Sequence, residues 1–189
     1  MKPLFVALTI VLASALTACS KTETPPVTSA AAAPQTYDMV AANAKGFTVG
    51  SLMSVNTVYV LFDPQCPHCG HLWAASQPLL GKAKFVWVPV AIINGNSAPQ
   101  GAALLSAPNP VEAMNLHEAS LLAGTGGTPP SGGTPADMAA SIKKNTELFG
   151  SLKLESVPFL VARHPQTGQF VSHSGAMDTA SLAQLLGLN

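Results

Sequence analysis

The residues with the most obvious chemistry in this sequence form the tetrapeptide Cys66-Pro67-His68-Cys69. Two cysteines separated by two residues lie on one face of a helix, near enough for their sulfurs to form a disulfide. If a helix begins here, the Cys66 thiol lies where free backbone N–H groups and the helix dipole favour an anion. A thiolate in that position attacks disulfides well and also leaves well. The motif therefore predicts a redox-active dithiol, with Cys66 as the nucleophile and Cys69 as the resolving thiol.

Two neighbouring residues could assist this dithiol. A helix terminus stabilises an anion by about 1–2 kcal/mol, whereas a fall of roughly three units in a thiol pKa corresponds to about 4 kcal/mol. A second donor is therefore needed, and His68 can present an N–H or a positive charge to the sulfur; the alternative is an exposed histidine without effect. Asp63 is the nearest acid. Asp63 could either assist proton transfer to Cys69 or cap the end of the strand in the Asp-Pro turn.

The same region raises the possibility of a metal site. Cys66, Cys69, His68 and His71 form a Cys-x-His-Cys-x-His set, but the sequence has no second CxxC. Since zinc sites usually draw ligands from two such motifs, we predict no metal, and no cofactor beyond the Cys66–Cys69 disulfide. A copper- or zinc-binding envelope lipoprotein remains the alternative of a different class. The other histidines have no partner motif, and we predict that they are surface or loop residues: His117, His164 and His173.

The N-terminus reads as a secretory signal over residues 1–18. Lys2 precedes an apolar segment from Leu4 to Leu16 that is too short to span a membrane. The tetrapeptide Leu16-Thr17-Ala18-Cys19 resembles the bacterial lipobox, which implies cleavage before Cys19 and lipid on its sulfur. The alternative is a plain signal peptide cut nearby. Ser20 after the cysteine favours outer-membrane delivery by the enterobacterial sorting pattern. We therefore expect a lipoprotein of the bacterial envelope that faces the periplasm.

Composition supports this interpretation. The chain has 3 cysteines, so a lipidated Cys19 leaves the CxxC pair alone. Such a short disulfide loop removes little entropy from the unfolded chain, which argues against a structural staple. The oxidising envelope suits a dithiol that cycles. The formal net charge is +0 and no basic run occurs, so nucleic acid is not an expected partner.

The chain is long enough for one domain, which we place at residues 37–189. Residues 20–36 are rich in Ser, Thr, Ala and Pro and predict a flexible tether. Residues 55–62 predict a strand buried on both faces. The remaining predicted elements are helices at 37–45, 67–80 (ended or kinked by Pro78), 98–106, 110–123, 135–149 and 178–188, strands at 46–50 and 84–93, and a hairpin of 157–162 with 169–173.

The order of these elements is strand, redox helix, strand, helical block, hairpin and helix. Together with the motif, this order predicts an α/β thioredoxin fold. Residues 97–149 would form a helical insertion between the second central strand and the hairpin. Pro89 within the second central strand is a mild objection to a central place in the sheet.

The stretch from Val58 to Cys69, continued by Trp73 and Pro78, resembles the catalytic domain of the DsbC/DsbG family of periplasmic disulfide isomerases and reductases. A strand that ends in Asp-Pro just before the CxxC is specific to that group, and the likeness covers roughly residues 55–189. The resemblance implies an envelope thiol–disulfide oxidoreductase that acts on cysteine-containing proteins. It also implies a membrane redox partner, either a DsbB-like oxidase or a DsbD-like reductase.

Two features depart from that family. Its N-terminal dimerisation domain has no counterpart before residue 55, so we expect a monomer. The Pro67-His68 pair is that of the oxidant DsbA, and so is a Val before the residue, Pro158, at the position of the fold's cis-proline. The resemblance implies that Val157 and Pro158 bind a substrate strand by β-addition. These residues favour a donor of disulfides, whereas the scaffold favours a reductase or isomerase that protects single cysteines.

Overall fold

A five-stranded sheet with the order β1-β3-β2-β4-β5 forms the centre of the computed structural model, which describes residues 33–129 and 135–188. Strands β2 and β3 run parallel, and the other neighbouring pairs are antiparallel. The bounds of the strands are Phe47–Gly50 (β1), Thr57–Phe62 (β2), Lys84–Pro89 (β3), Phe159–Arg163 (β4) and Phe170–Ser174 (β5).

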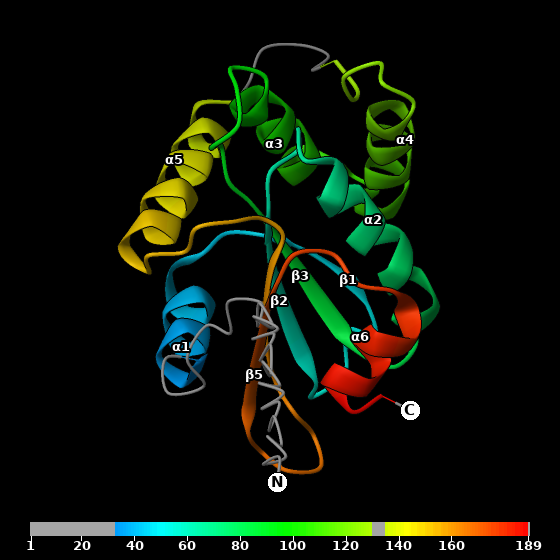
Figure 1. Cartoon of the computed structure of the whole chain (residues 1–189). Coiled ribbons are helices and arrows are strands. Elements are labelled where there is room, and N and C mark those ends of the chain that lie inside the picture. Colours follow the sequence, from blue (N-terminus) through cyan, green and yellow to red (C-terminus); the bar gives the residue numbers. More distant parts are fainter. Residues whose placement is uncertain (1–32, 130–134, 189) are drawn as a thin grey trace, which may run out of the picture.

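Helices cover both faces of this sheet. In Figure 1, α1 and α5 lie on one side of the sheet, and α2, α4 and α6 lie on the other. The bounds of the helices are Ala33–Asn43 (α1), Pro67–Ser76 (α2), Ser97–Ser106 (α3), Pro110–Leu122 (α4), Ala136–Ser151 (α5) and Thr179–Leu186 (α6), with a 3₁₀ turn, η1, at Gln77–Leu79. The predicted α/β architecture, with three helices inserted between β3 and β4, is confirmed.

Strand β2 is buried on both faces, as its apolar sequence predicts. Val60 and Phe62 belong to the core cluster beneath α2 and α6, whereas Leu61 belongs to the cluster beneath α1 and α5. This alternation is the period of two that a strand imposes on its side chains. Because β2 is surrounded by protein on both faces, the turn that follows it has a fixed position, and that turn leads directly into the Cys66 motif.

Strand β3 ends earlier than predicted, at Pro89 rather than at residue 93. It lies between β1 and β2, but β1 pairs only with Lys84–Trp87, so Pro89 has a strand neighbour on one side. Proline has no N–H to donate, which makes the end of the strand an acceptable place for it. Beyond it, the backbone N–H groups of Ile92 and Ile93 donate to a side chain, that of Asp63, instead of to a strand.

The helix ends follow local sequence signals. Helix α2 ends at Ser76 and continues as the η1 turn, which contains Pro78, the residue predicted to interrupt it. The carboxylate of Asp178 accepts a hydrogen bond of 3.0 Å from the N–H of Ser181, and so caps α6. Gly187 ends α6 in the left-handed conformation with φ of 62°.

Part of the predicted organisation lies outside the described residues. Cys19, the apolar leader and most of the tether fall in residues 1–32, and residues 130–134 belong to the predicted loop before α5. The first helix begins at Ala33 rather than at residue 37. Among the helices that the structure describes, none combines the length and apolar character needed to cross a membrane.

The buried side chain of Asn145 joins α5 to two loops. Its Oδ1 accepts a hydrogen bond of 2.9 Å from the N–H of Lys45, and its Nδ2 donates to the carbonyls of Lys45 at 2.8 Å and Pro89 at 3.0 Å. These bonds connect the segment after α1, the end of β3 and the helical insertion. Asn145 thereby satisfies the buried carbonyl of Pro89 and two partly buried backbone groups of Lys45.

We expect Asn145→Ala to lower the free energy of unfolding by about 2–3 kcal/mol, because it leaves these buried and partly buried backbone groups without their side-chain partner. Denaturant unfolding of the reduced protein measures this loss. The neighbouring exposed residue supplies the control, since Lys144→Ala should leave stability almost unchanged. Equal stability of the two variants would contradict the role assigned to Asn145.

Candidate functional site

The turn Asp63-Pro64-Gln65 carries the chain from the end of β2 to the start of α2. The N–H of Cys66 donates to the carbonyl of Asp63 at 2.9 Å, and the N–H of Cys69 donates to the carbonyl of Cys66 at 2.9 Å. Cys66 is the N-cap residue of α2, with Pro67 in the first turn, where its missing N–H costs nothing. The geometry thus places the Cys66 sulfur at the N-terminus of a helix, as the motif predicts.

The two thiols are both buried, but their pKa values shift in opposite directions. Cys66 is 5% exposed and Cys69 is 0% exposed. A hydrogen bond from the Cys69 thiol lowers the pKa of Cys66 to about 6, helped by the backbone N–H groups of Cys69 and His68 and by the charge of His68, against the effect of burial. Burial and the neighbouring Cys66 sulfur raise the pKa of Cys69 well above its usual value. At neutral pH, Cys66 is therefore the thiolate and Cys69 holds its proton.

Val157 and Pro158 approach Cys66 from the loop before β4. The Val157–Pro158 peptide bond is cis, as the family resemblance implies. The Sγ of Cys66 lies 3.5 Å from the carbonyl oxygen of Val157, to which the protonated thiol donates. Val157 is half-buried and Pro158 is buried. The backbone of Val157 is therefore the part of this loop that lies beside the nucleophile.

The carboxylate of Asp63 is fully buried and already engaged. Its oxygens accept hydrogen bonds from the N–H groups of Gln65 at 2.8 Å, Ile92 at 2.7 Å and Ile93 at 3.0 Å. These bonds link the turn after β2 to the segment after β3. The geometry favours the cap interpretation of Asp63 over proton transfer to Cys69, because both oxygens serve backbone donors.

The donors of the alternative metal site do not converge. His68 and His71 are both exposed on α2, and their rings lie 6.0 Å apart at an interplanar angle of 74°. Within residues 33–129 and 135–188, no group of three or more His, Cys, Asp and Glu side chains is arranged to hold a metal ion.

His117 of α4 lies in the core beside the active-site turn, so the prediction that it is a surface or loop residue is wrong. It is 1% exposed, its Nε2 donates to the carbonyl of Pro64 at 2.7 Å, and its Nδ1 accepts from the N–H of Thr128 at 3.1 Å. Because a carbonyl can only accept, Nε2 carries a hydrogen. Because Nδ1 accepts from an N–H group, it carries none, and the ring is therefore neutral. Gly127, with φ of 82°, packs directly against the ring, where a Cβ would collide with it.

A second set of contacts fastens the same loop to the turn. The side-chain amide of Gln65 donates to Oε1 of Gln100 at 2.5 Å and to the carbonyl of Gly126 at 2.8 Å, and Gln100 also donates to Gly126 at 2.9 Å. The helical insertion is therefore part of the site's support. Of the other two histidines, His164 is in the turn between β4 and β5 as predicted, whereas His173 is half-buried in β5.

Sequence reasoning missed one acid at this site, Glu118 of α4. It is 2% exposed, and neither of its carboxyl oxygens has a hydrogen-bond partner within the described part of the chain. Burial, and then the negative charge of Cys66, raise its pKa to about 8. A signal for it exists in the sequence, because the buried residues Met114, His117, Glu118 and Leu121 have the i, i+3, i+4, i+7 spacing of a helix face that packs inward.

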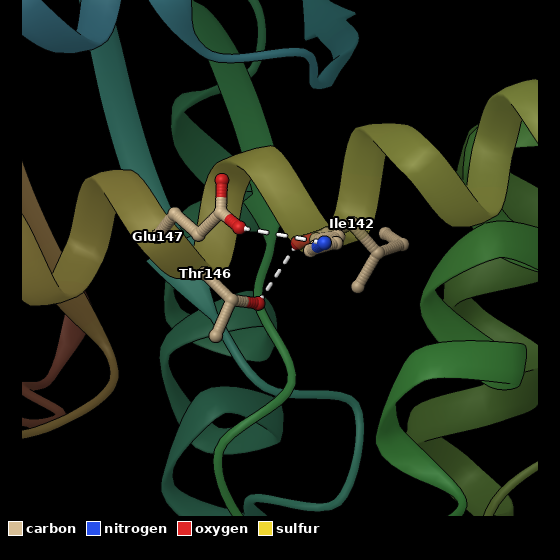
Figure 2. Close-up of polar contacts among 4 residues, drawn as sticks. Ile142, Thr146 and Glu147 are labelled. Carbon is tan, nitrogen blue, oxygen red and sulfur yellow. Dashed lines mark hydrogen bonds and ion pairs between the residues drawn. The ribbon is translucent and has the colours of Figure 1, made fainter.

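A shallow hollow elsewhere on the surface shares no residue with the cysteine site. Its lining comes mainly from α5, including Ile142 and Thr146, with Ala98 contributed by α3. Figure 2 shows that the Thr146 hydroxyl is turned back onto its own helix, where it donates to the carbonyl of Ile142 at 2.8 Å. Glu147 forms an exposed ion pair with Lys143, with an N–O distance of 3.8 Å. The Thr146 hydroxyl also accepts from the N–H of Ala91 at 3.0 Å, so these polar groups already have partners and the hollow adds nothing to the chemistry of the dithiol.

The fold and the CxxC at the start of α2 define a thioredoxin-fold protein with a redox motif. Solved structures agree: the catalytic domain of Proteus mirabilis ScsC has a TM-score of 0.62 at 17% identity, covering 84% of this chain and 96% of that chain. The thiol-disulfide exchange protein alpha-DsbA2 from Wolbachia pipientis has a TM-score of 0.59 at 18% identity, covering 84% and 94%. The predicted thioredoxin fold is confirmed.

Sequence comparison narrows the relationship. The chain is 30% identical over 132 residues to the thiol:disulfide interchange protein DsbG of Pseudomonas aeruginosa. This confirms the likeness to the DsbC/DsbG group that the residues before and after the CxxC predict. The match covers 69% of this chain and 50% of DsbG, so the chain spans about half the length of that relative. No protein-family model matches the sequence.

In the reduced protein, we expect the Cys66 thiolate to titrate with a midpoint near pH 6, followed by its ultraviolet absorbance. Cys69→Ala should raise this midpoint most, because it removes the largest stabilising contribution. His68→Ala should raise it less, since the charge of His68 is the smallest contribution, and His71→Ala should leave it unchanged. A larger shift in the His68 variant than in the Cys69 variant would contradict this order.

His117 should make stability depend on pH. Burial holds its folded-state pKa below the usual 6.5, so the unfolded chain binds more protons as the pH falls through that value. The free energy of unfolding therefore decreases on the acid side. We expect a larger loss of thermal stability between pH 7 and pH 5 in the native protein than in His117→Gln. His71→Gln, which changes an exposed ring, should keep the native pH dependence.

Proposed function

We propose that this chain is a thiol–disulfide oxidoreductase of the bacterial envelope, which exchanges disulfides with cysteine-containing proteins through Cys66. One observation carries the proposal: a thiol with a pKa of about 6 at the start of α2 lies beside a buried thiol whose pKa is raised well above its usual value. This asymmetry gives one sulfur that reacts with substrates and one that reacts only within the pair.

The exchange proceeds in two balanced steps. In the oxidising direction, a substrate thiolate attacks Cys66 of the disulfide, and Cys69 leaves and takes up a proton. A second substrate thiolate then attacks the substrate sulfur that is bonded to Cys66. The Cys66 sulfur leaves as the stabilised thiolate. The substrate loses two electrons and gains a disulfide, and the protein pair becomes a dithiol. The reverse sequence reduces a substrate disulfide.

The backbone of Val157 would hold the substrate during this exchange. Its carbonyl lies 3.5 Å from the Cys66 sulfur, so an extended substrate that pairs with this backbone brings its own cysteine to the nucleophile. Pro158 has no N–H and leaves the Val157 side of the loop as the pairing edge. Under this proposal, Pro67 and His68 adjust the reactivity of Cys66 and Asp63 holds the turn.

The low pKa of Cys66 favours a donor of disulfides, because stabilising the reduced form makes the disulfide more oxidising. The sequence likeness to DsbG favours a second candidate, a reductase or isomerase that protects single cysteines. A donor requires recycling by a DsbB-like membrane oxidase, and a reductase requires a DsbD-like electron donor. We further propose that a lipid on Cys19 anchors the protein on the periplasmic side, on the sequence pattern alone.

Equilibration of the purified protein against glutathione distinguishes these directions. We expect a reduction potential near about −120 mV, which is the range of a disulfide donor. A potential near about −200 mV or lower would instead support the reductase. Tight zinc or copper binding together with a complete absence of insulin reduction would overturn both.

Alanine variants of the cysteines test the roles in the exchange. Cys66→Ala should abolish insulin reduction, because it removes the nucleophile. Cys69→Ala should accumulate mixed disulfides with substrates, since nothing then attacks the Cys66 sulfur from within the pair. Cys19→Ala is the matched control and should retain full exchange. Mass spectrometry of both variants shows which cysteine holds the substrate. Mixed disulfides that accumulate on Cys69 in Cys66→Ala, and not on Cys66 in Cys69→Ala, would contradict the assignment.

A further inference from the structure

We propose that Glu118 of the helical insertion is the acid–base group for Cys69: it takes the Cys69 proton when the disulfide closes and returns it when the disulfide opens. This inference rests on the proposed exchange activity and assigns one of its steps to a residue outside the CxxC motif. It gives α4 a part in the chemistry as well as in the support of the active-site turn.

The carboxyl of Glu118 lies against α2 at the residue that follows Cys69. A Cβ added at Gly70 would lie 2.6 Å from Oε2 of Glu118, so the carboxyl occupies the space that any other residue at position 70 would fill. Leu122, one turn further along α4, covers the same spot, with its Cγ 3.3 Å from that Cβ position. The absence of a side chain at Gly70 therefore lets a carboxyl from another element approach the helix backbone beside the buried thiol.

Nothing else in the described parts of the chain accounts for this carboxyl. Its two oxygens are buried and unpartnered, although buried polar groups normally have hydrogen-bond partners. By contrast, the nearby carboxyl of Asp63 is held by backbone donors, and the adjacent ring of His117 is satisfied on both nitrogens. An unpaired buried carboxyl is costly for stability, so its place beside the thiols points to a function in their chemistry.

Among the elements packed against α4, only α2 with its N-cap residue brings titratable groups to Glu118. Helix α4 packs against α2, α3 and β1. The sequences of α3 and β1 contain no titratable side chain, whereas α2 and its N-cap contribute Cys66, Cys69, His68 and His71, of which both histidines are exposed. On α4 itself, the neighbour His117 is neutral and faces the Asp63 turn. The thiols are therefore the groups whose state Glu118 senses.

The protonation of Glu118 depends on whether Cys66 is a thiolate or part of a mixed disulfide, and the change has the direction that the reaction needs. While Cys66 is a thiolate, its charge helps to hold the proton on Glu118, whose pKa is about 8. Burial is the larger cause of that raised pKa and does not change, but when Cys66 enters a mixed disulfide its charge disappears and the pKa of Glu118 falls, so a larger fraction of Glu118 is carboxylate. At this moment Cys69, whose own pKa is raised, must lose its proton to attack.

Neither sulfur of the pair is a hydrogen-bond partner of the Glu118 oxygens. In the closing step, the Cys69 S–H proton therefore passes to the Glu118 carboxylate through one water molecule, and the Cys69 sulfur forms a bond to the Cys66 sulfur. The bond between Cys66 and the substrate sulfur breaks, and its electron pair leaves with the substrate as a thiolate. The protein pair loses two electrons and the substrate gains them. Opening is the reverse: the protonated carboxyl of Glu118 gives its proton to the departing Cys69 sulfur.

Rapid mixing of the reduced full-length protein with glutathione disulfide, followed by acid quench and mass spectrometry, separates the two steps. Formation of the mixed disulfide reports on Cys66, and its closure reports on Cys69. We expect Glu118→Gln to slow closure about 10²-fold at pH 7, in the range ascribed to general bases. The first step should keep its native rate and pH midpoint, because that midpoint belongs to Cys66.

The pH profile of closure distinguishes proton transfer from a merely structural role. The native rate should rise through a titration at or below about pH 8 and then level, whereas in Glu118→Gln it should keep rising with hydroxide. Glu118→Asp retains a carboxyl and should restore a levelling profile at a reduced rate. Glu147→Gln makes the same change at an exposed residue of α5 and should match the native protein.

The outcomes separate this inference from the proposed function. Native exchange together with unchanged closure in Glu118→Gln would refute the role of Glu118 and leave the oxidoreductase intact. Slower closure with an unchanged pH profile would also refute it, as a packing effect. If the reduced native protein forms no mixed disulfide with glutathione disulfide, the proposed function itself is wrong, and the inference fails with it.

Discussion

The buried carboxylate of Asp63 fixes the geometry on which the rest of this site depends. By accepting from the N–H of Gln65 and from those of Ile92 and Ile93, it holds the end of β2, the segment after β3 and the start of α2 together. Charge-assisted hydrogen bonds of this kind are short and directional. The position of Cys66 relative to the sheet follows from them, because its own N–H is bonded to the carbonyl of Asp63.

The helical insertion adds further hydrogen bonds that hold the turn after β2 in place. From α3, Gln100 bonds to Gln65 and to Gly126, and from α4, His117 bonds to Pro64 and to Thr128. Every one of these contacts ends on the turn after β2 or on the loop after α4. Leu104 of α3 and Met114 of α4 also belong to the buried cluster that contains Cys69, and burial is the main cause of the raised pKa of Cys69. The difference between the two thiols therefore originates in tertiary packing as much as in the CxxC motif.

The order of elements and the position of the dithiol could be predicted because they depend on local signals. Apolar β-branched residues marked β2, Pro67 marked the start of α2, Pro78 marked its end, and Asp178 capped α6. Pro89 was also informative, but the end of β3 depended on how far β1 extends beside it. That extent is a long-range pairing, which the sequence of β3 does not contain.

The errors at the site have the same origin. His117 has no partner motif in the sequence, because its partners, Pro64 and Thr128, lie in other segments. Glu118 was overlooked since an acid in a helix is usually solvated, and its significance depends on its contact with Gly70 of another helix. The sequence by itself determined the fold class, the redox motif and which cysteine begins the helix, because near neighbours along the chain decide those features. Tertiary structure alone decided which distant carboxyl and imidazole meet the thiols, because burial and charge act through space.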